Sequence, residues 1–93
     1  MFSIPRVNVI ESDEGFSVEV LVPDGIIYRE GTKTLYIESS FVTGPAVLGI
    51  HSTSIKTWKP PDNSKAINKR KREKIADNVR RAFLFRGIEI EVV

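Results

Sequence analysis

The sequence contains no cysteine, which excludes disulfide cross-links, thiolate metal sites and cysteine nucleophiles. It contains a single histidine, His51, so neither a zinc site of the Cys-His type nor a Cys-His catalytic pair can form. No segment approaches the roughly 18 consecutive apolar residues that a membrane-spanning helix needs. We therefore expect no metal, no cofactor and no membrane partner.

Catalytic and ligand-binding motifs are also missing. There is no Gly-x-Ser-x-Gly elbow, no phosphate-binding loop and no His-Glu-x-x-His pair. The acidic residues Glu11, Asp13 and Glu14 lack the alternating spacing that wraps a calcium ion, so they indicate a solvated hairpin tip. From the residues alone we expect a protein that is not an enzyme.

What the chain does contain is typical of a small globular domain. Its 93 residues are 41% apolar and 28% charged, which suits one hydrophobic core and excludes a disordered chain. We expect a single domain over residues 1–93. Pro5 and Arg6 interrupt the start of the chain before a signal peptide's apolar segment could form, so we expect a cytoplasmic protein.

The first half of the chain, residues 1–55, has the period of β-strands. Phe16, Val18 and Val20 alternate with polar or partly polar positions over residues 16–22, the period of a half-buried strand. Gly31 lies in a short turn that predicts a hairpin on either side of it. The other expected strands are residues 7–11, 26–29, 33–39, 46–51 with an extension to 55, and 88–92.

The second half predicts one helix. Pro60 and Pro61 exclude a helix from the loop at residues 56–64, so we expect the helix at about residues 65–86, with Ser64 or Asn68 as its cap and Gly87 as its end. At 100° per residue one stripe of this helix is apolar; it consists of Ile75, Val79, Ala82 and Phe83. The expected fold is α+β: an antiparallel β-meander of about five to six strands, with this one helix packed on one face.

Charge is distributed unevenly along the chain. Residues 1–54 carry three basic and seven acidic residues, whereas residues 55–93 carry eleven basic and five acidic residues. Four consecutive cations at residues 69–72 oppose the helix dipole, which favours acids near a helix start. Two interpretations remain open: a solvated face laced by ion pairs to Glu73 and Asp77, or a surface that binds an acidic partner.

Trp58 is the only tryptophan and lies between two lysines, just before the two prolines. An indole at such a position either plugs one end of the core or anchors a partner. The candidate partner-binding residues are Trp58, Lys56, Lys59, Arg70, Lys74 and Arg81.

Two segments resemble one known family. The string Ser54-Ile55-Lys56-Thr57-Trp58-Lys59-Pro60-Pro61, followed by residues 79–90, is similar to the C-terminal half of the immunity protein 74 family, small bacterial proteins of polymorphic toxin systems. The strand Leu35-Tyr36-Ile37-Glu38 also resembles a strand of that family. The resemblance implies a non-enzymatic inhibitor that binds a cognate toxin.

We therefore hypothesise a protein-interaction domain that binds and neutralises a bacterial toxin through an acidic surface of that toxin. The alternative is a small nucleic-acid-binding protein that uses the Lys/Arg-rich helix, since such a face also attracts phosphates. The sequence is compatible with a monomer or a homodimer.

Overall fold

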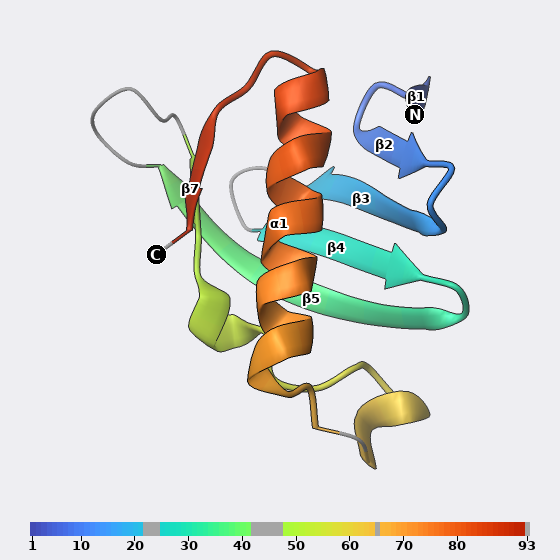
Figure 1. Ribbon diagram of the computed structural model, residues 1–93, viewed down its shortest axis with the longest axis vertical. Helices are drawn as coiled ribbons and strands as arrows, with labels where there is room; N and C mark the ends of the chain where they lie inside the picture. Colours follow the sequence, from blue (N-terminus) through green and yellow to red (C-terminus); the bar gives the residue numbers. More distant parts are fainter. Residues whose placement is uncertain (22–24, 42–47, 65, 93) are drawn as a thin grey trace.

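Seven strands and one long helix form the protein (Figure 1), in a computed structural model that describes residues 1–21, 25–41, 48–64 and 66–92. The strands form a single curled sheet in the order β1-β2-β3-β4-β5-β6-β7, and the helix lies across one face of it. The elements are β1 Phe2–Arg6, β2 Val9–Ser12, β3 Phe16–Leu21, β4 Gly25–Glu30, β5 Lys33–Phe41, β6 Leu48–Ile50, α1 Lys69–Phe85 and β7 Ile90–Val92. The predicted α+β class is confirmed.

The first six strands pair with their sequence neighbours in antiparallel register, as the predicted meander requires. Gly15 and Gly31 sit at the turns that follow β2 and β4, with φ of 98° and 62°. Such backbone angles strain any residue with a Cβ, which explains why glycine occupies both turns. The last residue of the strand expected at residues 16–22 and the first two of the strand expected at 46–51 lie outside the described residues.

The last strand corrects the prediction of a purely antiparallel meander. β7 runs parallel to β6, with Leu48 opposite Ile90 and Ile50 opposite Val92. Parallel neighbours need a long crossover, and α1 supplies it between these two strands. The helix is therefore a connection within the sheet as well as its cover.

β1 is a strand that the prediction did not include, and it raises the number of strands from six to seven. It is an edge strand with four of its five residues exposed, so it lacks the apolar alternation that identifies the other strands. Pro5 is compatible with this position because an edge strand has one side free of ladder hydrogen bonds.

Two predicted boundaries were wrong. Residues 52–54 do not extend β6 but form a 3-10 turn, in which the Ser54 hydroxyl donates to the His51 carbonyl at 2.6 Å and accepts from the Glu38 amide at 3.0 Å. Serine hydroxyls that bond nearby backbone favour turns over strands.

The helix begins at Lys69 rather than at residue 65, because Ile67 donates its amide to the Lys56 carbonyl at 2.8 Å and remains in the loop.

Both ends of α1 use the capping residues that the sequence offered. The Asn68 side chain accepts from the Lys71 amide at 2.8 Å, which confirms one of the two predicted caps. Gly87, at φ 78°, ends the helix as predicted, and the Ile88 amide returns to the Phe83 carbonyl at 2.9 Å.

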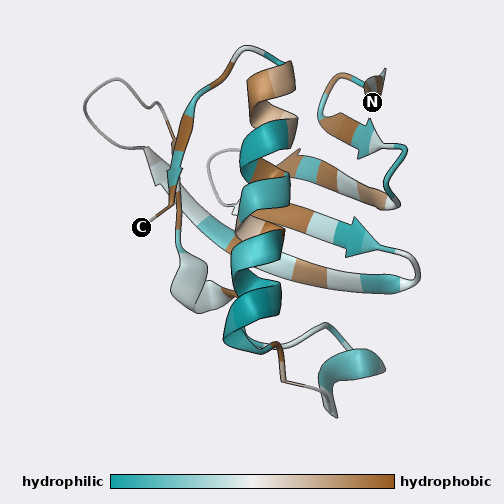
Figure 2. Cartoon of the chain, viewed as in Figure 1, coloured by the Kyte–Doolittle hydropathy of each residue, from teal (hydrophilic) through white to brown (hydrophobic). Residues whose placement is uncertain are grey.

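The core lies between α1 and the sheet. The predicted apolar stripe of the helix is buried, and it packs against the inward side chains of the strands, among them Val18, Ile26 and Ile37. Figure 2 shows hydrophilic colour on most of the outward side of α1, in contrast to the hydrophobic bands of the strands behind it. Only the last turn, with Leu84 and Phe85, presents large apolar side chains outward.

Truncation of the buried helix face should destabilise the fold. Phe83 is 2% exposed, so we expect Phe83→Ala to lower the free energy of unfolding by roughly 3 to 5 kcal/mol. The matched control is Leu84→Ala, since Leu84 is 46% exposed and should cost less than about 1 kcal/mol. Urea denaturation measures both, and equal midpoints for the two variants would contradict this packing.

Candidate protein-binding surface

Trp58 is held in the core at the end of the sheet near the start of α1. Its side chain is 6% exposed and its ring lies 6.4 Å from that of Tyr28. The next residue, Lys59, donates its amide to the Thr34 carbonyl of β5 at 2.7 Å, and Lys33 places its ammonium 5.6 Å over the indole. The structure thus places Trp58 as a plug of the core, with little surface left for a partner.

A chain of polar contacts fastens α1 to the sheet. Asn78, buried in the helix, donates from Nδ2 to the Tyr28 hydroxyl at 2.9 Å. That hydroxyl donates to Oε1 of Glu30 at 2.7 Å, and Lys71 donates from Nζ to Oε2 of the same carboxylate at 2.6 Å. Two turns of the helix are thereby bonded to one strand, β4.

Arg81 extends this chain of contacts to the hairpin between β2 and β3. It donates to Oδ1 of Asn78 at 2.6 Å and to both carboxylate oxygens of Glu14 at 3.1 and 3.3 Å. Its Nε lies 3.4 Å from Asp77 without hydrogen-bond geometry. We call the set Lys71, Glu30, Tyr28, Asn78, Arg81 and Glu14 the polar chain.

The charges of the polar chain stabilise one another. Burial alone would raise the pKa of Glu30, but hydrogen bonds from Lys71 and Tyr28 outweigh it and the net shift is downward. Burial raises the pKa of Tyr28 well above its ordinary value, which by itself already keeps the hydroxyl protonated at neutral pH. The hydrogen bonds and charge of Arg81 lower the pKa of Glu14.

Four of the six predicted binding residues lie outside these contacts. The side chains of Lys56, Lys59, Arg70 and Lys74 are exposed, and none forms an ion pair or hydrogen bond with another described residue. Lys56 and Lys59 belong to the loop that leads into α1, whereas Arg70 and Lys74 lie one helical turn apart near its start (Figure 1). We call these four residues the basic surface.

The remaining helix charges are mostly paired, as one interpretation of the sequence expected. Asp77 contacts Arg80 at 2.8 Å, and Lys69 lies 4.0 Å from Glu73. The hydrogen bond from Arg80 lowers the pKa of Asp77. The two interpretations therefore apply to different residues: ion pairs lace part of the helix, whereas the basic surface and Arg72 carry cations without an ion pair to a described residue.

Comparison with models of protein families matches residues 18–93 to immunity protein 74. The chain belongs to the immunity protein 74 family. The match begins in β3 and includes the Trp58 loop, α1 and β7, so it confirms the resemblance noted in the sequence. Nothing in it supports the nucleic-acid alternative. Searches of curated proteins and of solved structures found no match.

Within the described ranges, no group of three or more His, Cys, Asp or Glu side chains is arranged to hold a metal ion. In the same part of the chain, no helix is long and apolar enough to cross a membrane.

Sequence reasoning missed the polar chain of this immunity-family protein. One signal was present: Asn78 falls three residues after Ile75 and beside Val79, on the apolar stripe, where a polar residue requires a buried partner. Glu30 and Lys71 are 41 residues apart, and no local pattern links them. Arg81, predicted as a binding residue, lies in the polar chain and is 30% exposed at its side chain.

Replacement of Glu30 should weaken the fold in a pH-dependent way. Because the pKa of Glu30 in the folded protein lies below its ordinary value of 4.5, its ionised form stabilises the fold at neutral pH. We expect Glu30→Gln to cost roughly 1 to 2 kcal/mol at pH 7. The difference should shrink as the pH falls from about 4.5 through the folded-state pKa.

Chemical denaturation at pH 7, 5 and 3 measures this difference. Glu73→Gln is the control, since Glu73 is exposed and its contact with Lys69 is 4.0 Å, so its removal should change stability by less than about 0.5 kcal/mol. A cost of Glu30→Gln that is the same at all pH values would contradict the charge-based account.

Proposed function

We propose that this protein binds a cognate bacterial toxin and neutralises it without catalysis, in the cytoplasm of the cell that makes both. Family membership supports a toxin as the partner. Inhibition of this kind needs only that a bound protein covers the surface through which the toxin acts.

We propose the basic surface as the contact with the toxin. None of its four side chains forms an ion pair or hydrogen bond with a described residue, so binding an acidic surface would break no existing ion pair. The charge of Lys74 acts on Glu14 and Asp77 only at longer range, where it lowers the pKa of each carboxyl. Lys71 and Arg81, in contrast, would have to leave the polar chain before they could contact a partner. The single observation that carries the choice of this surface is that its four side chains form no ion pair, whereas Lys71 and Arg81 each bond a carboxylate of the polar chain.

The expected partner surface is acidic. Clustered unpaired cations steer an oppositely charged protein and raise its association rate, and this effect weakens as salt increases. Trp58 would contribute indirectly, since its buried ring and the Lys59 amide hold the loop that carries Lys56 and Lys59. A rigid loop loses less conformational entropy on binding than a mobile one.

Reversal of these four charges should abolish protection. The test uses the toxin encoded by the adjacent gene, co-expressed with the wild type or with the variant K56E/K59E/R70E/K74E. We expect the wild type to rescue growth, and we expect the reversed variant to fail and to bind purified toxin roughly 100-fold more weakly at low salt.

The matched control keeps every charge and changes only the side chains: K56R/K59R/R70K/K74R should rescue growth as the wild type does. Failure of the wild type to rescue cells from the toxin would contradict the proposed function. Full rescue by the reversed variant would contradict the proposed surface and leave toxin binding in place.

A further inference from the structure

The face of the sheet that α1 does not cover carries a self-complementary pattern of side chains. Along each strand, residues alternate between the core and this outer face, and cross-strand neighbours share a face. On β3 the core side chain is Val18, whereas Ser17 and Glu19 point outward. We call this side the helix-free face.

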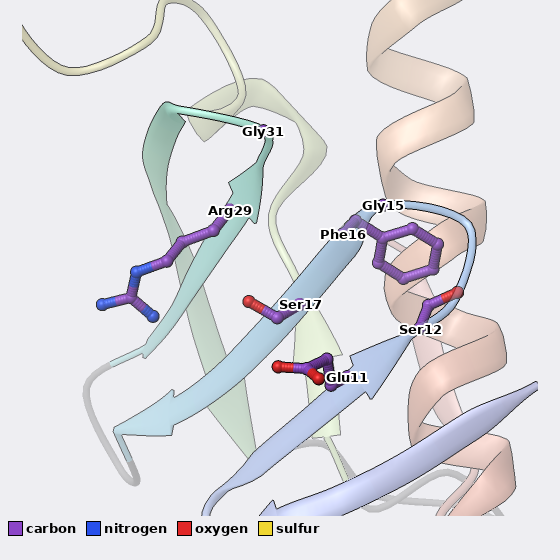
Figure 3. Close-up of a pocket in the computed structure, with 7 residues that line it drawn as sticks. All are labelled: Glu11, Ser12, Gly15, Phe16, Ser17, Arg29 and Gly31. Carbon is purple, nitrogen blue, oxygen red and sulfur yellow. The ribbon is translucent and has the colours of Figure 1, made fainter.

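One row of this face places opposite charges on either side of β3. Glu11 on β2 lies opposite Ser17 on β3, and Ser17 lies opposite Arg29 on β4. In Figure 3 these three side chains point to the side of the sheet away from α1, whereas Phe16 points toward the helix. They line a shallow hollow of about 300 Å³ together with the two hairpin turns. Glu11 and Arg29 are each about 4.8 Å, one strand spacing, from the β3 axis.

A second row repeats the symmetry with apolar and aromatic side chains. Val9 on β2 and Ile27 on β4 flank Glu19 of β3 in this row. One strand further out, Arg6 on β1 lies opposite Val9, and Tyr36 on β5 lies opposite Ile27. Each flanking position thus has a counterpart at the same distance on the other side of β3: Val9 and Ile27 are both apolar, and Arg6 and Tyr36 are a cation and an aromatic ring.

The middle of the helix-free face is apolar although it lies outside the core. Val9 lies on this face outside the core cluster, but it is only 4% exposed because its own chain already covers it. The apolar surface that remains comes from Leu21 and Ile27, which are half-buried. The Tyr36 ring lies close over Gly25, since a Cβ at Gly25 would be 2.6 Å from its Cζ. An aromatic ring laid across a sheet presents the flat surface that protein contacts favour.

We propose that two copies of this protein associate through their helix-free faces, around a two-fold axis that runs along β3. This rotation exchanges β2 with β4 and β1 with β5. Glu11 of each copy then faces Arg29 of the other, Val9 faces Ile27, and Arg6 faces Tyr36. Such an isologous contact requires that the same patch be complementary to itself, which these rows are.

Charge also fits this arrangement. Arg29 donates to Glu19 within its own chain at 2.8 Å and has further guanidinium donors for Glu11 of the second copy. Glu19 is the one residue of these rows that meets its own like charge across the axis, and the neighbouring Arg29 neutralises it. A cation over the Tyr36 ring adds a further attraction from Arg6.

The expected dimer is weak. Five strands at about 4.8 Å and six residues at about 3.4 Å give a sheet area of roughly 400 to 500 Å² per copy. This is below the roughly 800 Å² per partner of a standard stable interface, so we expect a dissociation constant in the micromolar range. Arg70 and Lys74 lie on α1, which covers the opposite face of the sheet, so dimerisation leaves these two cations of the basic surface accessible.

Sedimentation velocity of the purified protein, from about 1 to 300 μM, tests the proposal. The wild type should shift from monomer to dimer across this range, in line with the micromolar affinity expected for so small an interface. The single variants E11R and R29E should each weaken dimerisation at least tenfold, because each places like charges across the axis. An equimolar mixture of the two should recover dimers, because positions 11 and 29 then carry opposite charges at both of their contacts across the axis.

The mixture is the decisive measurement, since a folding defect in either variant cannot produce recovery. E89R makes the same charge change outside this face, in the connection before β7, and should dimerise as the wild type does. A wild type that stays monomeric at all these concentrations, or a mixture no stronger than its components, would overturn the dimer. Neither result affects the toxin proposal, which is tested by growth rescue.

Discussion

The arrangement of helix and sheet depends on the hydrogen bonds of the Tyr28 hydroxyl. This hydroxyl is buried in the core, where an unpaired hydroxyl would cost several kcal/mol. Asn78 on α1 and Glu30 on β4 satisfy it together, so the helix has one rotation and one height at which this hydrogen bonding is complete. Apolar packing alone would tolerate a helix shifted along the sheet, whereas this network specifies its position.

The position of the helix decides which cations are exposed to solvent without an ion pair inside the protein. Lys71 and Arg81 are turned toward Glu30 and Glu14 and hold the fold together. Arg70 and Lys74 are exposed and lie in the first two turns of α1, which follow the loop with Lys56 and Lys59. The basic second part of the sequence thus contains structural cations, Lys71 and Arg81, and the exposed cations of the basic surface. The proposed toxin contact uses the basic surface.

Local patterns in the sequence predicted much of the fold and little of the site. Period-two alternation located the inner strands, and the apolar stripe with Asn68 and Gly87 located most of the helix, because these signals depend only on near neighbours. β1 lacks alternation as an exposed edge strand, and the parallel pairing of β7 follows from the path of the chain. The polar chain joins residues up to 67 positions apart, so no local pattern could identify which cations it consumes.

Lysine footprinting of the toxin complex tests the central claim most directly. The protein is acetylated with and without the toxin encoded by the adjacent gene, and the modification rate of each lysine is measured by mass spectrometry. We predict that Lys56, Lys59 and Lys74 become protected on binding, whereas Lys71, bonded to Glu30, reacts slowly in both states. Unchanged rates at Lys56, Lys59 and Lys74 in a stable complex would contradict the account.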